Sequence, residues 1–125
     1  MQDRPTAQEL LKAAQDFCEN DLLPALTGRV RFHARVLQNV LGILEREWMN
    51  EESAVRAEYE RLRALLALDE GAESFGALGD EVRAANIELS DKIRAGEMDD
   101  RLEETLDALE ETVREKLAIA NPNWF

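Results

Sequence analysis

Three arginines surround the only histidine of the chain, and these four residues are the ones best suited to chemistry. Arg29, Arg31, His33 and Arg35 fall within seven positions. Guanidinium groups bind phosphates and carboxylates through paired hydrogen bonds, and a histidine with a pKa of about 6.5 suits a general base or an anion contact. The cluster therefore indicates a site for an anionic ligand. His33 could instead be a buried and hydrogen-bonded core residue. The sequence favours this interpretation, because apolar positions surround His33 on the predicted helix.

Arg31 and Arg35 are also poorly placed electrostatically. They lie one turn apart near the start of a predicted helix, where like charges repel and the helix dipole disfavours cations. We therefore expect an acidic group beside them. The favoured source is the acidic helix predicted near residues 100–120 or the one near 52–68, and the alternative is a phosphate or an acidic partner.

Metal and nucleophile sites are poorly supported. Cys18 falls on the apolar stripe of a helix, which predicts an inert core thiol. One cysteine and one histidine cannot assemble a zinc site. A di-iron bundle needs Glu-x-x-His, but Val30 stands three residues before His33. We therefore expect no metal and no cofactor.

One carboxylate pair resembles the magnesium ligands of all-helical nucleotide pyrophosphohydrolases. Glu88 and Asp91 have the required spacing, but the upstream match, Glu70 with Glu73, falls around a glycine in a predicted loop. With 27 acidic residues in 125, such spacings arise readily by chance. The sequence therefore favours a non-enzymatic role, although it leaves the question of an enzyme open.

The residues that could position these groups belong to helices. No segment alternates as a strand does, and the prolines lie outside the apolar periodic runs. The fold class expected is all-α, a compact bundle of about five helices in a single domain over residues 1–125. Thr6 with Glu9, and Asp100 with Glu103, predict capping boxes, and Gly96 predicts a helix end. The predicted helices cover about 6–21, 28–49, 52–68, 75–95 and 100–120.

The helix predicted at 28–49 should be central. Its apolar residues cover an arc of roughly 200°, against about 100° for an ordinary surface helix, so we expect them to be buried. The helix predicted at 100–120 also has apolar residues at helical spacing, and we expect this stripe to be buried. The arc contains Val30, Phe32, His33, Val36, Leu37, Val40, Leu41, Ile43, Leu44 and Trp48, and the stripe contains Leu102, Leu106, Leu109, Val113 and Leu117.

Charge is unevenly distributed along the chain. The net charge is −12, yet residues 22–44 contain three arginines and no acid, while residues 97–115 contain nine acids and two arginines. An acidic chain is unsuited to binding nucleic acid. The acidic helix face is expected to be solvated, and mimicry of nucleic acid is the weakest hypothesis. No apolar run approaches the length of a membrane span, so we expect a cytoplasmic protein without membrane contact.

The C-terminus ends in two aromatic residues, Trp124 and Phe125, after an Asn-Pro helix stop at Asn121. Such a tail either folds back as a core plug, which is favoured, or anchors another chain.

Segments at both ends of the chain carry a family resemblance. They are Arg4 to Leu11, Leu23 to Leu26, Arg29, Phe32 to Val36, Asn39, Glu45 to Glu47 and Lys116 to Pro122. The chain resembles a small bacterial family of helical domains of unknown function that accompanies aminoglycoside-phosphotransferase-like kinases and acyl-CoA dehydrogenases. The resemblance implies no catalytic residues. Its pattern positions at Arg29, His33, Asn39, Asn121 and Pro122 are candidates for a shared role.

Two functions are therefore expected from different classes. The first is a non-enzymatic accessory domain whose partner is a kinase of that type or an acyl-CoA dehydrogenase, with its helices and aromatic tail as the contact surface and with a homo-oligomer possible. The second is a small anion-binding or catalytic domain that uses the basic end of the 28–49 helix.

Overall fold

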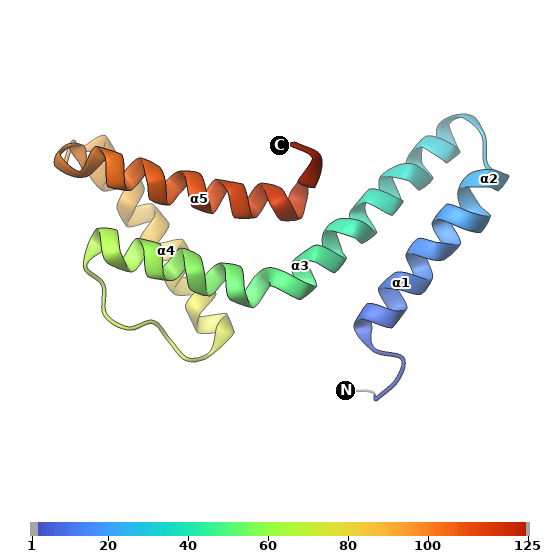
Figure 1. Cartoon of the computed structure of the whole chain (residues 1–125), viewed down its shortest axis with the longest axis horizontal. Coiled ribbons are helices and arrows are strands. Elements are labelled where there is room, and N and C mark those ends of the chain that lie inside the picture. The colour runs from blue at the N-terminus through green and yellow to red at the C-terminus, as the bar shows by residue number, and fades with distance from the viewer. Residues whose placement is uncertain (1–2, 125) are drawn as a thin grey trace. The chain divides into compact units, whose positions relative to one another are not determined.

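The computed structural model describes residues 3–124, and these residues are helical without a strand, which confirms the all-α class (Figure 1). The long helices are α1 (Ala7–Phe17), α3 (Gly28–Leu66), α4 (Phe75–Arg94) and α5 (Leu102–Ala120). The short elements are a π-helical turn (Cys18–Leu22), α2 (Leu23–Ala25) and two 3₁₀ turns (Asp99–Arg101 and Pro122–Trp124).

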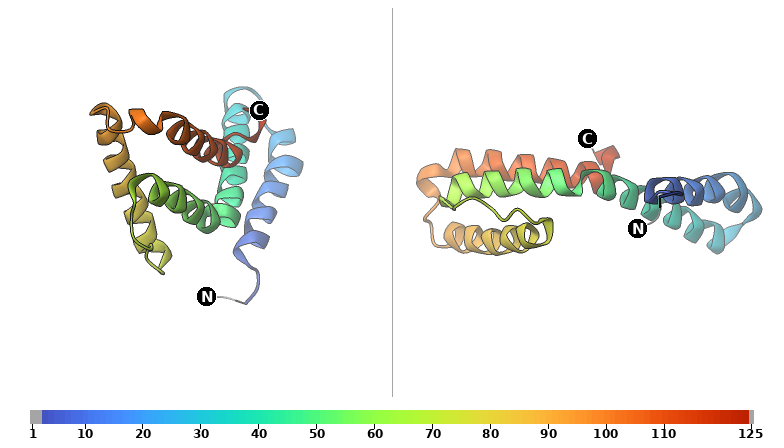
Figure 2. Two further views of the ribbon diagram at one scale, coloured as in Figure 1. Left: turned by 60° about the vertical axis from the view of Figure 1, so that its left-hand side comes forward. Right: turned by 90° about the horizontal axis from the view of Figure 1, so that it is seen from below.

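The helices fall into two compact units. The N-terminal unit ends at Met49 and the C-terminal unit begins at Asn50, so that α3 contributes to both. In the N-terminal unit, α1 runs antiparallel beside the first half of α3 (Figure 1 and Figure 2). In the C-terminal unit, the second half of α3 packs with α4 and α5.

The start and end of α1 follow from local chemistry. Thr6 and Glu9 form the predicted capping box, with the Thr6 hydroxyl accepting from the Glu9 N–H at 3.2 Å. Pro24 has no N–H to donate to the carbonyl four residues earlier, and its ring crowds that carbonyl in an α-helix. The chain widens into the π-helical turn just before this proline, where the Leu23 N–H donates to the Cys18 carbonyl.

The prediction of separate helices at 28–49 and 52–68 is wrong, because α3 runs through both without a break. Residues 49–52 are Met-Asn-Glu-Glu and contain neither glycine nor proline, so nothing in the main chain stops the helix there. The helix ends instead at Leu66, where Ala67 adopts φ 54° and the Leu68 N–H donates back to the Arg63 carbonyl at 3.2 Å.

The core of the C-terminal unit forms around α4. This helix begins after Ser74, whose hydroxyl accepts from the Ala77 N–H at 3.4 Å, and Gly96 ends it with φ 78°. Helical periodicity predicts one buried face for it, and the structure buries all of that face except Ile93. The predicted residues are Leu78, Val82, Ala85, Leu89 and Ile93. The buried residues are Tyr59, Leu62 and Leu65 of α3, Leu78, Val82, Ala85 and Leu89 of α4, and Met98.

The predicted buried stripe of α5 is wrong for Leu102, Leu106 and Val113, which are exposed. The face turned to the core instead carries Thr105 and Thr112, which are buried. Each threonine hydroxyl donates to a carbonyl one turn earlier in its own helix, at 2.8 and 3.0 Å. Threonine side chains are small, and these hydrogen bonds satisfy their hydroxyl groups. They can therefore pack in the core much as apolar side chains do. The second capping box is also absent, since the N-cap residue of α5 is Arg101 and no side chain caps this end.

Polar contacts join the three helices of the C-terminal unit. Glu58 of α3 is buried and accepts from Asn86 of α4 and from Lys116 of α5, each at 2.8 Å. The Arg61 Nε donates to the Thr112 hydroxyl at 3.0 Å. Arg101 donates to the carbonyls of Leu65 and Ala64 at 2.8 and 3.2 Å, which satisfies the C-terminal end of α3.

No helix within residues 3–124 has the length and apolar character required to cross a membrane.

Candidate functional site

In the N-terminal unit, α1 packs against the more polar side of α3. The buried residue on this side of α3 is Ala34. Two residues that precede α3 in the chain, Cys18 and Leu23, are buried as well. The Gln15 Nε2 donates to Glu45 at 3.0 Å, which ties the middle of α1 to α3. Because Ala34 is small, α1 can approach α3 closely along this side. The wide apolar arc therefore lies on the side of α3 that α1 does not cover.

Most of that arc is exposed, and it is the main exposed feature of the unit. The prediction that the arc is buried is therefore wrong, although Leu41 and Ile43 are half-buried. The large apolar side chains that are exposed have exposed fractions between 43% and 68%. We call them the apolar α3 face; they are Val30, Phe32, Val36, Leu37, Val40, Leu44 and Trp48. Monomeric proteins rarely expose contiguous apolar patches larger than a few hundred Å², and larger ones mark interaction sites.

The structure brings only part of the predicted anion site together. The Arg29 Nε donates to the His33 Nε2 at 3.3 Å, one turn along α3. The Arg31 guanidinium donates to the Leu23 carbonyl in α2, so one of its N–H groups is already used within the protein. Arg35 and Asn39 are exposed, and no ion pair of the described residues includes Arg35.

His33 is exposed, so the favoured interpretation of a buried core histidine is wrong. It belongs to the apolar α3 face by position, and its ring meets the Phe32 ring edge-on at 5.7 Å between centroids. Cys18, in contrast, is buried and free, as predicted.

At the C-terminal end, Asn121 closes α5. Its N–H donates to the Leu117 carbonyl at 2.7 Å, and its own carbonyl accepts from the Trp124 N–H at 3.0 Å. The Trp124 side chain is 67% exposed, so the favoured core plug is wrong for this residue, and the anchor alternative remains open. Phe125 lies outside the described residues.

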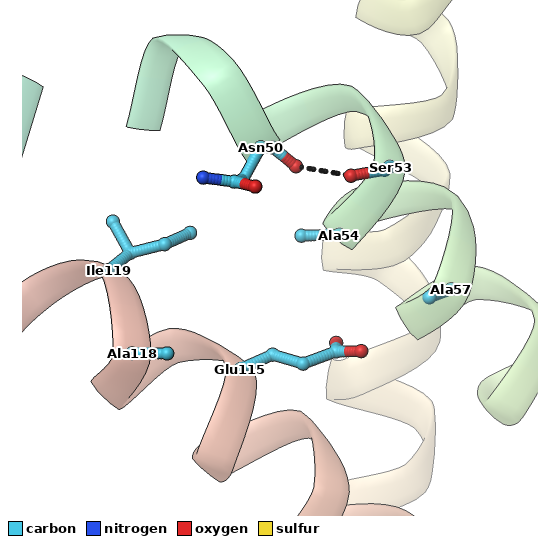
Figure 3. Close-up of a pocket in the computed structure, with 7 residues that line it drawn as sticks. All are labelled: Asn50, Ser53, Ala54, Ala57, Glu115, Ala118 and Ile119. Atoms are coloured by element: carbon cyan, nitrogen blue, oxygen red, sulfur yellow. Dashed lines mark hydrogen bonds between the residues drawn. The ribbon is translucent and has the colours of Figure 1, made fainter. Parts of the chain in front are cut away.

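The C-terminal unit has an open groove of about 420 Å³ between the first turns of its part of α3 and the last turns of α5 (Figure 3). The Ser53 hydroxyl is already bonded to the Asn50 carbonyl at 2.9 Å, and Glu115 is bonded to Arg61 at 3.2 Å. The groove therefore offers mainly small apolar surface rather than a reactive group. Its lining is Asn50, Ser53, Ala54, Ala57, Glu115, Ala118 and Ile119.

The acidic groups considered as magnesium ligands are paired with basic neighbours on α4. Glu88 lies 3.8 Å from Lys92, and Asp91 lies 3.5 Å from Arg94. Glu70 precedes α4 and lies outside any helix. Within residues 3–124, no three histidine, cysteine, aspartate or glutamate side chains are grouped as a metal site.

The acidic side of α5 is partly used for internal pairing. Arg101 binds Glu104 at 2.7 and 2.9 Å, and this hydrogen bond holds the pKa of the Glu104 carboxyl below its usual value. Glu115 is held by Arg61. Glu110 pairs with Arg114 at 2.7 Å. Leu102, Leu106 and Val113 form an apolar stripe on the outer side of α5, and exposed acids lie along one edge of it.

Sequence reasoning identified the apolar α3 face but assigned it to the core. It likewise identified Leu102, Leu106 and Val113 as an apolar stripe of the last helix but assigned them to the core, whereas they are exposed.

Comparison with known proteins gives a family. No curated protein and no solved structure matches the chain. A family model, a domain of unknown function designated DUF6285, matches residues 24–124, which include α3, α4 and α5. Because the match covers most of the chain, this protein belongs to the DUF6285 family.

Proposed function

We propose that this chain is a non-enzymatic protein-interaction domain. The observation that carries the proposal is the apolar α3 face, where large side chains such as Phe32 and Trp48 are more than half exposed. Interaction sites are enriched in aromatic residues on helices that present an amphipathic face. A helix that exposes its apolar side and packs with its polar side has the pattern expected of a surface that another protein covers.

The partner class follows from the family resemblance. We propose a kinase of the aminoglycoside-phosphotransferase type, with an acyl-CoA dehydrogenase as the second candidate. The surface proposed for this partner is the α5 stripe of Leu102, Leu106 and Val113, with the acids along one edge, and the exposed Trp124. An apolar stripe with one acidic edge suits a partner surface that is apolar at its centre and basic along one side.

Size-exclusion chromatography of the full chain with such a kinase tests the proposal. We expect a complex that Leu106→Asp weakens, because the substitution places a charge in the apolar contact. Ile87→Asp is the matched control, since Ile87 is an exposed apolar residue on α4. Deleting Trp124 and Phe125 should weaken the complex while the melting temperature stays constant. Absence of a complex with either candidate, or equal effects of both Asp substitutions, would argue against this function.

A further inference from the structure

The two ends of the apolar α3 face carry opposite charges on the same line of the helix. Arg29 and Glu47 are 18 residues apart, which is five full turns of about 3.6 residues and a distance of about 27 Å. Arg29 uses its Nε for His33, which leaves both Nη groups of the guanidinium for another acceptor. Glu47 is exposed and makes no ion pair with any residue in the described part of the chain.

The side chains between these charges are apolar. Phe32, Val36, Val40 and Leu44 are exposed along the same side of α3, and the midpoint between the two charges falls at residue 38. Val36 and Val40 therefore lie at equal distances from the midpoint. The same midpoint relates Phe32 to Leu44, and it relates the two charges of opposite sign, Arg29 and Glu47.

We propose that two copies of this chain associate through their apolar α3 faces as an antiparallel pair, with Arg29 of each copy opposite Glu47 of the other. This inference rests on the proposed function, because it names the occupant of the surface that carries that function. A twofold axis that crosses the apolar α3 face between Val36 and Val40, at the level of residue 38 along the helix, brings Val36 of one copy against Val40 of the second, and the reciprocal contact is made by symmetry.

Charge determines the orientation. Arg31 turns to the Leu23 carbonyl and Glu45 accepts from Gln15 of α1, so these charges lie away from the apolar α3 face. Arg29 and Glu47 lie on its line. A parallel pair would oppose Arg29 to Arg29 and Glu47 to Glu47. The antiparallel pair instead sets Arg29 of each copy against Glu47 of the other. Like charges across an interface are unfavourable, so complementarity selects this arrangement.

The size of the face is sufficient for a weak to moderate dimer. A face over residues 30–48 is about 28 Å long on a helix about 11 Å in diameter, and half of such a cylinder offers on the order of 500 Å². Two copies would then bury about 1,000 Å², the lower limit of the range for biological interfaces. Exposed Phe32 and Trp48 supply the aromatic contacts that dominate binding energy in interfaces of this size.

Sedimentation equilibrium of the full chain, over a series of concentrations and without any kinase, tests the inference. The expected mass is twice 14.2 kDa at high concentration. Val40→Asp should raise the dimer dissociation constant about a hundredfold because it buries an unpaired charge. Ile87→Asp is the matched control, since Val40 and Ile87 are 44% and 65% exposed on different helices. The control should leave the dissociation constant unchanged.

A charge swap tests the orientation with surface residues alone. Glu47→Arg should raise the dissociation constant about tenfold, because each Arg29 then faces a second arginine. Combining Glu47→Arg with Arg29→Glu should restore dimerisation, since the antiparallel charges are complementary again. A parallel pair would show no such restoration. Circular dichroism of each variant verifies that the helices persist.

A monomer at all concentrations would overturn the inference, as would a dimer that Val40→Asp leaves intact. A monomer that binds the kinase, with binding lost in Val40→Asp, would also overturn it, because the kinase would then occupy the apolar α3 face and the proposed function would stand. A dimer that binds neither candidate enzyme would support the inference and contradict the proposed partner.

Discussion

The Lys116 Nζ lies 2.8 Å from the Glu58 carboxylate, and this pair ties α5 to α3 inside the C-terminal unit. Glu58 is 6% exposed, whereas the Lys116 side chain is largely exposed. Water can solvate the Lys116 ammonium, whereas the buried Glu58 carboxylate relies on its hydrogen-bond partners to offset the cost of burial. Removing the lysine leaves a buried charge that only Asn86 satisfies.

Lys116→Met is accordingly expected to lower the free energy of unfolding by about 1–3 kcal/mol, less than for a fully buried pair because water reaches the lysine side. The double variant Lys116→Met/Glu58→Gln should recover part of this loss, since the uncompensated charge is gone. Urea denaturation gives both values. Arg114→Met, which removes an exposed pair with Glu110, is the control and should cost about 0.5 kcal/mol or less. Equal losses for the two single variants would contradict this account.

Gly71 is required for close packing. A Cβ at this position would lie 2.5 Å from Tyr59 Cε1 and 2.7 Å from Leu78 Cδ1, and both neighbours are core residues. Gly71→Ala should therefore destabilise the protein by about 1–3 kcal/mol. Gly79→Ala is the matched control on α4, where a Cβ meets nothing within 4 Å. There alanine should stabilise the helix by about 0.5–1 kcal/mol. Thermal denaturation should thus shift the melting temperature in opposite directions.

The ends of α3 and α4 have the same geometry with different residues. Ala67 and Gly96 both have positive φ, and in each case the following N–H donates to a carbonyl five residues earlier. Only glycine adopts this conformation without steric cost. Ala67→Gly should raise the free energy of unfolding by about 0.5–1 kcal/mol, and Gly96→Ala should lower it by about 1 kcal/mol. Changes of the same sign at the two positions would be inconsistent with these caps.

Tyr59 should make stability depend on alkaline pH. Burial raises the pKa of its phenol, with nearby Glu81 adding to the effect. The fold thus favours the neutral phenol, so its stabilising contribution is complete below the unfolded pKa of about 10 and is lost as the pH rises through the folded value. Because Tyr59 is the single tyrosine, phenolate absorbance reports its titration directly. The midpoint should be higher in buffer than in concentrated urea, and identical midpoints would show that the ring is not buried.

The basic start of α3 should not be a phosphate site. Arg31 is bonded to the Leu23 carbonyl and Arg29 to His33, so only Arg35 presents its whole guanidinium to solvent. Phosphate and chloride at equal ionic strength should therefore raise the melting temperature equally. A rise specific to phosphate that Arg35→Ala abolishes would restore the anion-binding alternative.

Several local features could be predicted from the sequence. The capping box at Thr6 and Glu9 and the helix end at Gly96 each depend on residues within one turn, and the structure confirms both. The same rule failed at Asp100 and Glu103, where the chain forms a 3₁₀ turn before α5. The all-α class follows from the same local rules. The absence of glycine and proline between Met49 and Ser53 is also a local feature, and it is consistent with the continuous α3.

Tertiary structure alone decided which sides of α3 and α5 are buried. Apolar periodicity shows that a helix has a face suited to burial, but not which helix covers it or whether any does. Thr105 and Thr112 enter the core because their hydroxyls find carbonyls in their own helix, so small size outweighs polarity. Ala34 turns to α1 while Val36 and Val40 stay exposed, because the packing partner selects a side by close approach. Which side of a helix is buried depends on contacts between residues that are distant in the chain. A local sequence pattern carries no information about these contacts.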